Sequence, residues 1–190
     1  MPAHRRVQIG IVAALLAIIA LVQRPDGRLH LFFIEGAGDA VLIQAPNGSH
    51  ILVDGGSDPA ALVSGIGAHL PFWKRHLDAV VLTSADRAHL PGQVAALARY
   101  QAGLVVVTGL GQSSAVLSEW QRQLRVAGAA LKVGEAGQTF RVGGLAFQIL
   151  VAGTAGSGMV LRIEYGRTSA VLAHTISPAM EQAIIDTGGV

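Results

Sequence analysis

The sequence contains no cysteine, and charged residues make up only 14% of its 190 positions. The lack of cysteine excludes a disulfide framework, a thiolate zinc site and a thiol nucleophile, so any metal would have to be held by His, Asp or Glu. The formal net charge is only +2, and much of the positive excess lies at the N-terminus, at Arg5 and Arg6. Bulk charge therefore gives no support to nucleic-acid binding.

Hydrophobic residues are abundant by contrast, at 51% of the chain, and the 24 glycines stand mostly at turns between short apolar runs. This composition excludes an intrinsically disordered or collagen-like chain. A length of 190 residues suits one well-buried domain with a short appendage and is too short for two ordinary domains.

The appendage is an apolar segment, residues 7–23, which follows a basic flank at residues 1–6. Its apolar run would form a helix about 24 Å long, a little short of the ~30 Å hydrocarbon core of a bilayer. We expect a single-pass membrane anchor, with Arg5 and Arg6 in the cytoplasm and the following domain outside it. A cleaved signal peptide and a buried soluble helix are the alternatives, although no small-x-small cleavage pattern follows the run.

After a linker at residues 24–28, apolar runs separated by turn residues predict a domain over residues 29–190. Short strands come first, then strands alternating with helices, then short strands again. We expect strands at 29–34, 39–45, 49–54, 77–83, 104–108, within 131–151, and at 159–165 and 168–172, with helices at 59–70, 91–101, 113–126 and from about 177. This order predicts an α/β fold in which two sheets pack face to face with helices outside, an αββα sandwich.

Reactive groups in such folds gather at the carboxyl ends of strands. Two motifs stand there: Asp54-Gly55-Gly56, and TSADRAH at residues 83–89, which contains Asp86 and His89. Asp54 suits a strand-end carboxylate that accepts hydrogen bonds, and Gly55 and Gly56 suit a close backbone approach. Asp86 and His89 are candidate metal ligands; alternatively, Asp86 caps the next helix and His89 is a packed core residue.

Other polar or aromatic residues have plainer explanations. We expect Gly36, Gly38 and Asp39 to form a tight turn rather than a phosphate cradle, and Trp120 to be a packing residue. A small basic loop surrounds Phe72 and Trp73; it contains His69, Lys74, Arg75 and His76. This loop could stack on single-stranded bases or serve as a solvated helix–strand connection.

Four segments in this order carry a family resemblance: IEGAGDA (34–40), ILVDGG (51–56), LTSADRAHLPG (82–92) and the late hairpin MVLRIEYGRTS (159–169). Together they resemble the C-terminal metallo-β-lactamase-like domain of ComEC-type competence proteins, where the first three motifs are approximately D-V-G-Q-G-D-A, I-D-G-G and T-H-P-D-A-D-H-I-G-G. The resemblance covers residues 29–187. It implies a metallo-β-lactamase-like αββα sandwich, and the preceding membrane segment agrees with it.

The resemblance also implies a divalent-metal site for phosphodiester hydrolysis, but several ligand positions differ in this chain. Ser84 stands in place of the first His of the family motif, and Ala88 in place of its second Asp. Thr175 aligns with the Asp of a late T-G-D motif. A further family motif, G-H-H-G-S, would lie beyond Val190, so we expect a C-terminally incomplete domain.

Asp86 and His89 thus remain as vestigial metal ligands, with His174 as a further candidate. A catalytic site needs about three protein ligands, so we expect no bound cofactor and no catalysis. The predicted function is that of a membrane-anchored, ComEC-like domain related to DNA uptake, with single-stranded DNA and a further membrane-spanning region of a competence channel as candidate partners. The alternatives are a Zn- or Mn-dependent phosphodiesterase or nuclease with a reduced ligand set, and a truncated remnant without function.

Overall fold

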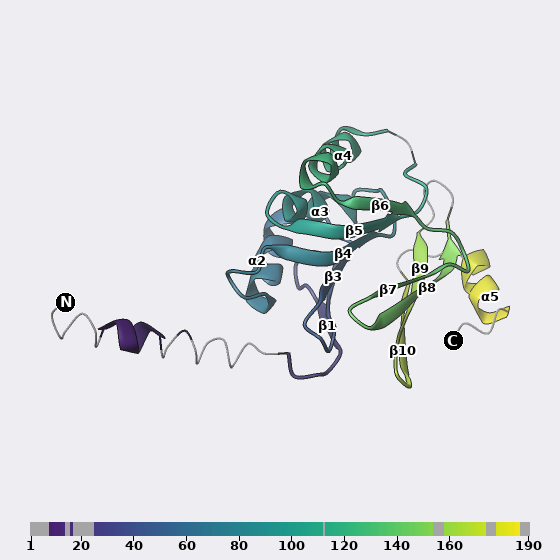
Figure 1. Cartoon of the computed structure of the whole chain (residues 1–190). Helices are drawn as coiled ribbons and strands as arrows, with labels where there is room; N and C mark the ends of the chain where they lie inside the picture. The colour runs from purple at the N-terminus through teal and green to yellow at the C-terminus, as the bar shows by residue number, and fades with distance from the viewer. Residues whose placement is uncertain are drawn as a thin grey trace.

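The computed structural model of this chain describes residues 8–13, 16, 25–111, 113–153, 158–173 and 178–186. From residue 25 onward the described residues form a layered α/β domain (Figure 1). The predicted membrane helix at residues 7–23 lies largely outside the described residues, although residues 8–13 are helical and exposed. Among the helices in these ranges, none has both the length and the apolar character needed to cross a membrane.

The larger sheet has six strands in the order of the sequence, β1-β2-β3-β4-β5-β6. The first three strands pair antiparallel and β3 to β6 pair parallel, so the predicted β-meander leads directly into strand–helix alternation. The strands are β1 (His30–Phe33), β2 (Val41–Gln44), β3 (His50–Val53), β4 (His76–Leu82), β5 (Gln101–Val107) and β6 (Ala130–Val133).

The smaller sheet has four antiparallel strands in the order β10-β9-β8-β7. These strands are β7 (Thr139–Val142), β8 (Leu145–Ala152), β9 (Met159–Tyr165) and β10 (Thr168–Ala173). The turn at Gly166 has a positive φ of 59° and joins β9 to β10, as the sequence predicts for the late hairpin.

Two of the helices begin where a side chain accepts hydrogen bonds from their first amide groups. Asp58 accepts hydrogen bonds from the amides of Ala60 and Ala61, and Ser114 accepts one from that of Leu117. The helices that these two residues cap are α2 (Pro59–His69) and α4 (Ala115–Ala127); the others are α3 (Leu90–Leu97) and α5 (Pro178–Asp186).

The central strands are buried on both faces, which explains their continuous apolar sequences. On one face, Leu52, Val80 and Val105 join a core with the helices; this core includes Trp120 of α4. On the other face, alternate residues such as Ile51 join a second core with the smaller sheet. Helix α5 contacts β8 of the smaller sheet, away from the larger sheet (Figure 1). The layers are therefore helix, sheet, sheet, helix, and the predicted αββα sandwich is confirmed.

Candidate functional site

The two predicted site motifs meet at the carboxyl ends of β3 and β4. Asp54-Gly55-Gly56 follows β3, and residues 83–89 connect β4 to α3. The two segments are joined directly, because the amide of Gly55 donates a hydrogen bond to the carbonyl of His89 (2.8 Å). Neighbouring parallel strands bring their ends to one edge of the sheet, so residues far apart in sequence become neighbours here.

Asp54 is fully buried and joins the ends of the two strands. One carboxylate oxygen accepts a hydrogen bond from the amide of Thr83 (2.8 Å), and the other accepts one from the Thr83 hydroxyl (2.6 Å). Among the described residues it alone has a positive φ (57°) without being glycine. Asp54 accepts hydrogen bonds, as the sequence predicts, and these two come from Thr83 at the end of the next strand.

The glycines of this edge permit backbones to touch. A Cβ atom on Gly56 would lie 1.9 Å from the carbonyl oxygen of Ala37, and one on Gly55 would lie 2.1 Å from the amide nitrogen of Gln93. Both distances are far below van der Waals contact, so no side chain fits at either position without a shift of the backbone. The structure thus confirms the close approach predicted for Gly55 and Gly56.

Asp86 organises the turn that leads into α3. Its carboxylate accepts hydrogen bonds from the Ser84 hydroxyl (2.9 Å) and the Ala88 amide (2.8 Å), and it bonds to Nδ1 of His89 (2.6 Å). Partial burial by itself raises the pKa of Asp86, but the hydrogen bonds from His89, Ser84 and Ala88 outweigh burial and hold the pKa below its ordinary value. Asp86 therefore caps the turn before the helix, while His89 occupies the N-cap position of α3 without a side-chain cap bond.

His89 is completely buried between two carboxylates. Opposite Asp86, its Nε2 lies 3.5 Å from a carboxylate oxygen of Asp39. The sequence prediction for Asp39 was only a tight turn; the turn is present, and it also brings the carboxylate to His89. The position of Asp39 in a loop at the same edge of the sheet is the signal from which this contact could have been found.

A divalent metal of the kind implied by the family resemblance does not fit these described residues. Both ring nitrogens of His89 face carboxylates, and no group of three His, Cys, Asp or Glu side chains in the described ranges is arranged to hold a metal ion. At the substituted positions, Ser84 bonds to Asp86 and Ala88 is exposed. His174 and Thr175 lie outside the described residues.

A buried polar link lies beneath this edge and was missed in the sequence. The side-chain amide of Gln93 donates to the carbonyl of Val81 (2.7 Å), and the indole N–H of Trp120 donates to the Gln93 side-chain oxygen (3.0 Å). Trp120 is thus a packing residue, as expected, but it also connects α4 through α3 to β4. A glutamine within an apolar helix sequence was the only signal for this link.

Comparison with known proteins gives a likeness in structure but none in sequence. No protein-family model and no curated protein matches the sequence. A HARLDQ-motif mutant of a metallo-β-lactamase from Cronobacter sakazakii matches with a TM-score of 0.56 at 14% identity, over 84% of this chain and 71% of that one. CmlA, a diiron β-hydroxylase from Streptomyces venezuelae, matches with a TM-score of 0.56 at 18% identity, over 85% of this chain but only 33% of CmlA. The domain has the metallo-β-lactamase fold.

Metals occur in other proteins with this fold, including Zn(2+)-bound PqqB from Methylobacterium extorquens, which is 16% identical, with a TM-score of 0.50 over 76% of this chain and 53% of that one. At such low identities the structural likeness establishes the fold only. The chemistry of the site in this chain must be inferred from its own residues.

Proposed function

We propose that this chain is a membrane-tethered domain of metallo-β-lactamase fold whose ligand-type side chains stabilise the loops of the former metal site instead of holding a catalytic metal. The observation that carries the proposal is the burial of His89 between Asp86 and Asp39. An imidazole that is hydrogen-bonded to Asp86 through Nδ1 and has the Asp39 carboxylate 3.5 Å from Nε2 supports the packing of the loops. To bind metal, one of these contacts would have to be exchanged for a ligand bond.

The polar partners of the site support the same conclusion. Ser84 donates to Asp86, and Thr83 donates twice to Asp54. The hydrogen bonds from Thr83 satisfy the buried carboxylate of Asp54, which would otherwise be costly to bury, and that from Ser84 satisfies the half-exposed carboxylate of Asp86. A catalytic metal centre instead directs about three ligands at one point and leaves a position open for water.

The role in DNA uptake is the finer part of the proposal and rests on the ComEC-like order of the motifs. We suggest that the domain contributes structure or contacts to a competence channel in the membrane rather than cleaving DNA. The membrane tether rests on the apolar run at residues 7–22.

One observation favours a second function, a metal-dependent phosphodiesterase or nuclease. Asp39 adds a third ligand-type side chain near His89 and Asp86, beyond the pair that the motif retains. In that case His89 would exchange one carboxylate contact for a Zn or Mn ion.

Metal content and turnover of the full chain in detergent distinguish the two functions. We expect substoichiometric Zn and Mn by elemental analysis and no hydrolysis of single-stranded DNA in added Mn. Replacing His89 with Ala should lower the free energy of unfolding by about 2 kcal/mol, because a buried side chain and its contacts with Asp86 and Asp39 are lost. The matched control is His76→Ala, which alters an exposed histidine at the start of β4 and should change stability by less than about 0.5 kcal/mol.

The opposite result is equally clear. One equivalent of tightly bound metal, with turnover that is lost in His89→Ala and kept in His76→Ala, would refute the non-catalytic proposal and establish the hydrolase.

A further inference from the structure

The connection between α2 and β4 exposes two aromatic side chains. Phe72 is 71% exposed and Trp73 is 49% exposed, and their rings meet edge to face with centroids 4.7 Å apart. Lys74 and Arg75 follow directly, and no acidic residue occurs between positions 69 and 77. Exposed aromatic surface is unfavourable in water, so this aromatic–basic loop (residues 71–75) is a candidate contact surface.

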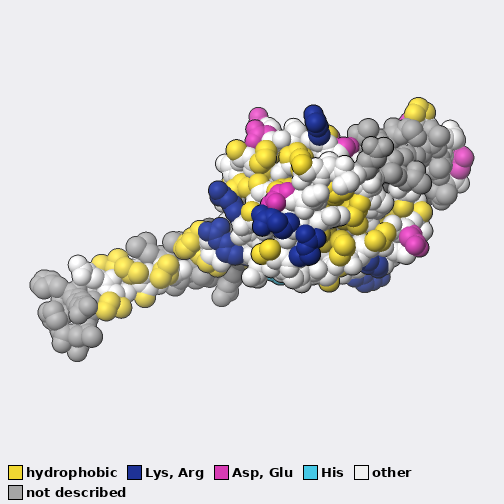
Figure 2. Space-filling model, turned by 90° about the horizontal axis from the view of Figure 1, so that it is seen from above, with side chains coloured by type: hydrophobic (Ala, Val, Ile, Leu, Met, Phe, Trp, Pro, Cys, Tyr) yellow, Lys and Arg dark blue, Asp and Glu magenta, His cyan; other side chains and the backbone are white. Residues whose placement is uncertain are grey.

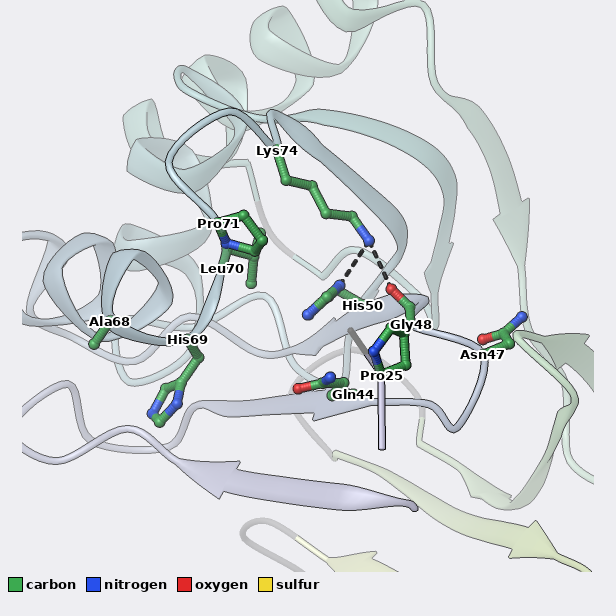
Figure 3. A pocket seen from close by; sticks show the side chains of 10 residues that line it. All are labelled: Pro25, Gln44, Asn47, Gly48, His50, Ala68, His69, Leu70, Pro71 and Lys74. Carbon is green, nitrogen blue, oxygen red and sulfur yellow. Dashed lines mark hydrogen bonds between the residues drawn. The ribbon is translucent and has the colours of Figure 1, made fainter. Parts of the chain in front are cut away.

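The loop is fixed to the place where the domain meets the N-terminal part of the chain. Its Lys74 donates a hydrogen bond to the carbonyl of Gly48 (2.7 Å) and bonds to Nδ1 of His50 (2.8 Å) (Figure 3). Pro25 lies against Gly48, and Pro25, Pro71 and Lys74 together line a pocket of about 430 Å³. The first described residue of the domain and the aromatic–basic loop are therefore neighbours.

The sequence brings the apolar N-terminal run close to the same surface. This run ends at Val22, so at most about 10 Å of extended chain separates it from Pro25. Figure 2, which views the domain from above, on the side of α4 in Figure 1, shows several Lys and Arg side chains on that face. A bilayer spanned by residues 7–22 would thus have its surface within reach of the loop.

We infer that the aromatic–basic loop rests on the membrane, with Phe72 and Trp73 in the interfacial region and Arg75 near anionic headgroups; this inference rests on the membrane tether of the proposed function. A Trp side chain at the membrane interface buries its ring among the lipids while its indole N–H remains hydrated. Basic side chains beside it are attracted to anionic lipid headgroups. Two contacts, the tether and the loop, would set the orientation of the domain.

This orientation has a consequence for the candidate site. The loop lies at the amino ends of the parallel strands, and the candidate site lies at their carboxyl ends. A strand as long as β4 spans roughly 23 Å, so the candidate site would face away from the bilayer into solution. Stacking of single-stranded bases on the loop is a separate possibility that the test below distinguishes.

Tryptophan fluorescence tests the inference in the full chain, because the chain has only two tryptophans and Trp120 is completely buried. The chain is reconstituted into vesicles of phosphatidylcholine and phosphatidylglycerol, with the phosphatidylcholine brominated on its acyl chains as a contact quencher. We expect bromolipid to quench a large part of the Trp73 emission, up to about half of the total, since Trp120 stays in the core. Trp73→Phe should abolish the quenching.

A matched control places the reporter at the opposite end of the sheet. Phe33 at the end of β1 is 71% exposed, the same exposed fraction as Phe72, and lies near the turn that carries Asp39. In a Trp73→Phe background, Phe33→Trp should report no quenching by bromolipid.

Flotation with the vesicles distinguishes a failure of the membrane tether from a failure of the inference about the loop. A chain that does not float with the vesicles refutes the tether and this inference together. A chain that floats without quenching of Trp73, or with equal quenching at position 33, refutes the inference and leaves the tether standing. Quenching of Trp73 by oligothymidine in detergent, with no effect of bromolipid, would identify a nucleic-acid surface and also overturn it.

Discussion

Gly55 and Gly92 form a contact that only glycine permits. A Cβ atom on Gly92 would lie 1.8 Å from the carbonyl oxygen of Gly55, and one on Gly55 would lie 2.1 Å from the amide nitrogen of Gln93. The Asp-Gly-Gly segment and the first turn of α3 therefore lie backbone against backbone. This contact places Asp54 and His89 at one edge.

Gly92→Ala should be strongly destabilising for this reason. We expect a loss of about 3 kcal/mol in the free energy of unfolding, because the new methyl group meets backbone atoms that cannot move aside. The matched control is Gly67→Ala in the exposed part of α2, where nothing lies within 4 Å and alanine should stabilise the helix by about 0.5–1 kcal/mol. Urea unfolding, followed by circular dichroism, measures the change in the free energy of unfolding for both variants. Equal changes in the two variants would refute the close contact.

His50 makes stability depend on pH. Burial and, to a lesser extent, the charge of Lys74 lower the pKa of His50 from 6.5 to about 4, although Asp78 acts in the opposite direction. The unfolded chain binds a proton at His50 as the pH falls below about 6.5, whereas the folded chain does not until about pH 4. The contribution of His50 to the free energy of unfolding is therefore fully present above about pH 6.5 and is lost as the pH falls toward 4.

We expect this histidine alone to remove on the order of 2 kcal/mol between pH 7 and pH 4. Urea unfolding at several pH values, compared with His50→Gln, isolates the effect, because the carboxylates titrate alike in both proteins. Parallel stability curves for the two proteins would show that His50 does not titrate differently on folding.

At the scale of elements, α3 is attached in a different way from α2 and α4. Those two helices begin at side-chain caps, Asp58 and Ser114, whereas the N-cap residue of α3, His89, makes no side-chain cap bond. Helix α3 is instead held by Gln93, whose side chain bonds to both β4 and Trp120 of α4. A polar link in an otherwise apolar layer fixes how the helices sit on the sheet.

Breaking this link should reveal coupling between α3 and α4. Gln93→Leu leaves the indole N–H of Trp120 and the carbonyl of Val81 without their partner, and we expect a loss of about 2–3 kcal/mol. The double variant Gln93→Leu/Trp120→Phe should lose at least about 1 kcal/mol less than the sum of the single losses. Gln123→Leu on the surface of α4 is the control, with an expected change of less than about 0.5 kcal/mol; strict additivity of the buried pair would argue against the link.

At the scale of the whole molecule, the domain has two cores, one on each face of the larger sheet. The fully buried members of both begin at Ile34 or later, and the first partly buried residue packed on them is Leu29. Among the described residues, those before Pro25 are exposed. The domain should therefore fold without the apolar N-terminal run.

Deletion of residues 1–24 tests this directly. We expect the free energy of unfolding to change by less than about 0.5 kcal/mol, while flotation with vesicles is lost or strongly reduced. A loss of several kcal/mol would instead support the buried soluble helix that the sequence leaves open. Urea unfolding in the absence of lipid, followed by the emission of the buried Trp120, measures the stability of both forms.

Local signals in the sequence were sufficient to predict the elements and their layers. Continuous apolar runs marked the central strands, as at residues 77–83 for β4, and Asp58-Pro59 marked the start of α2. The order of strands and helices then restricts the topology to few solutions, so the αββα sandwich followed. The motif at residues 83–89 lies at the carboxyl end of β4, the edge at which the sequence predicts the candidate site.

The pairing of polar groups, in contrast, became visible only in the folded chain. Asp39 lies beside His89, Trp120 bonds to Gln93, and Lys74 bonds to the Gly48 carbonyl, each across a long stretch of sequence. Such pairs depend on how strand ends and helices are brought together in space, and neither periodicity nor propensity encodes that information. Whether a ligand-type side chain is directed at a metal or at another side chain is therefore a property of the folded chain.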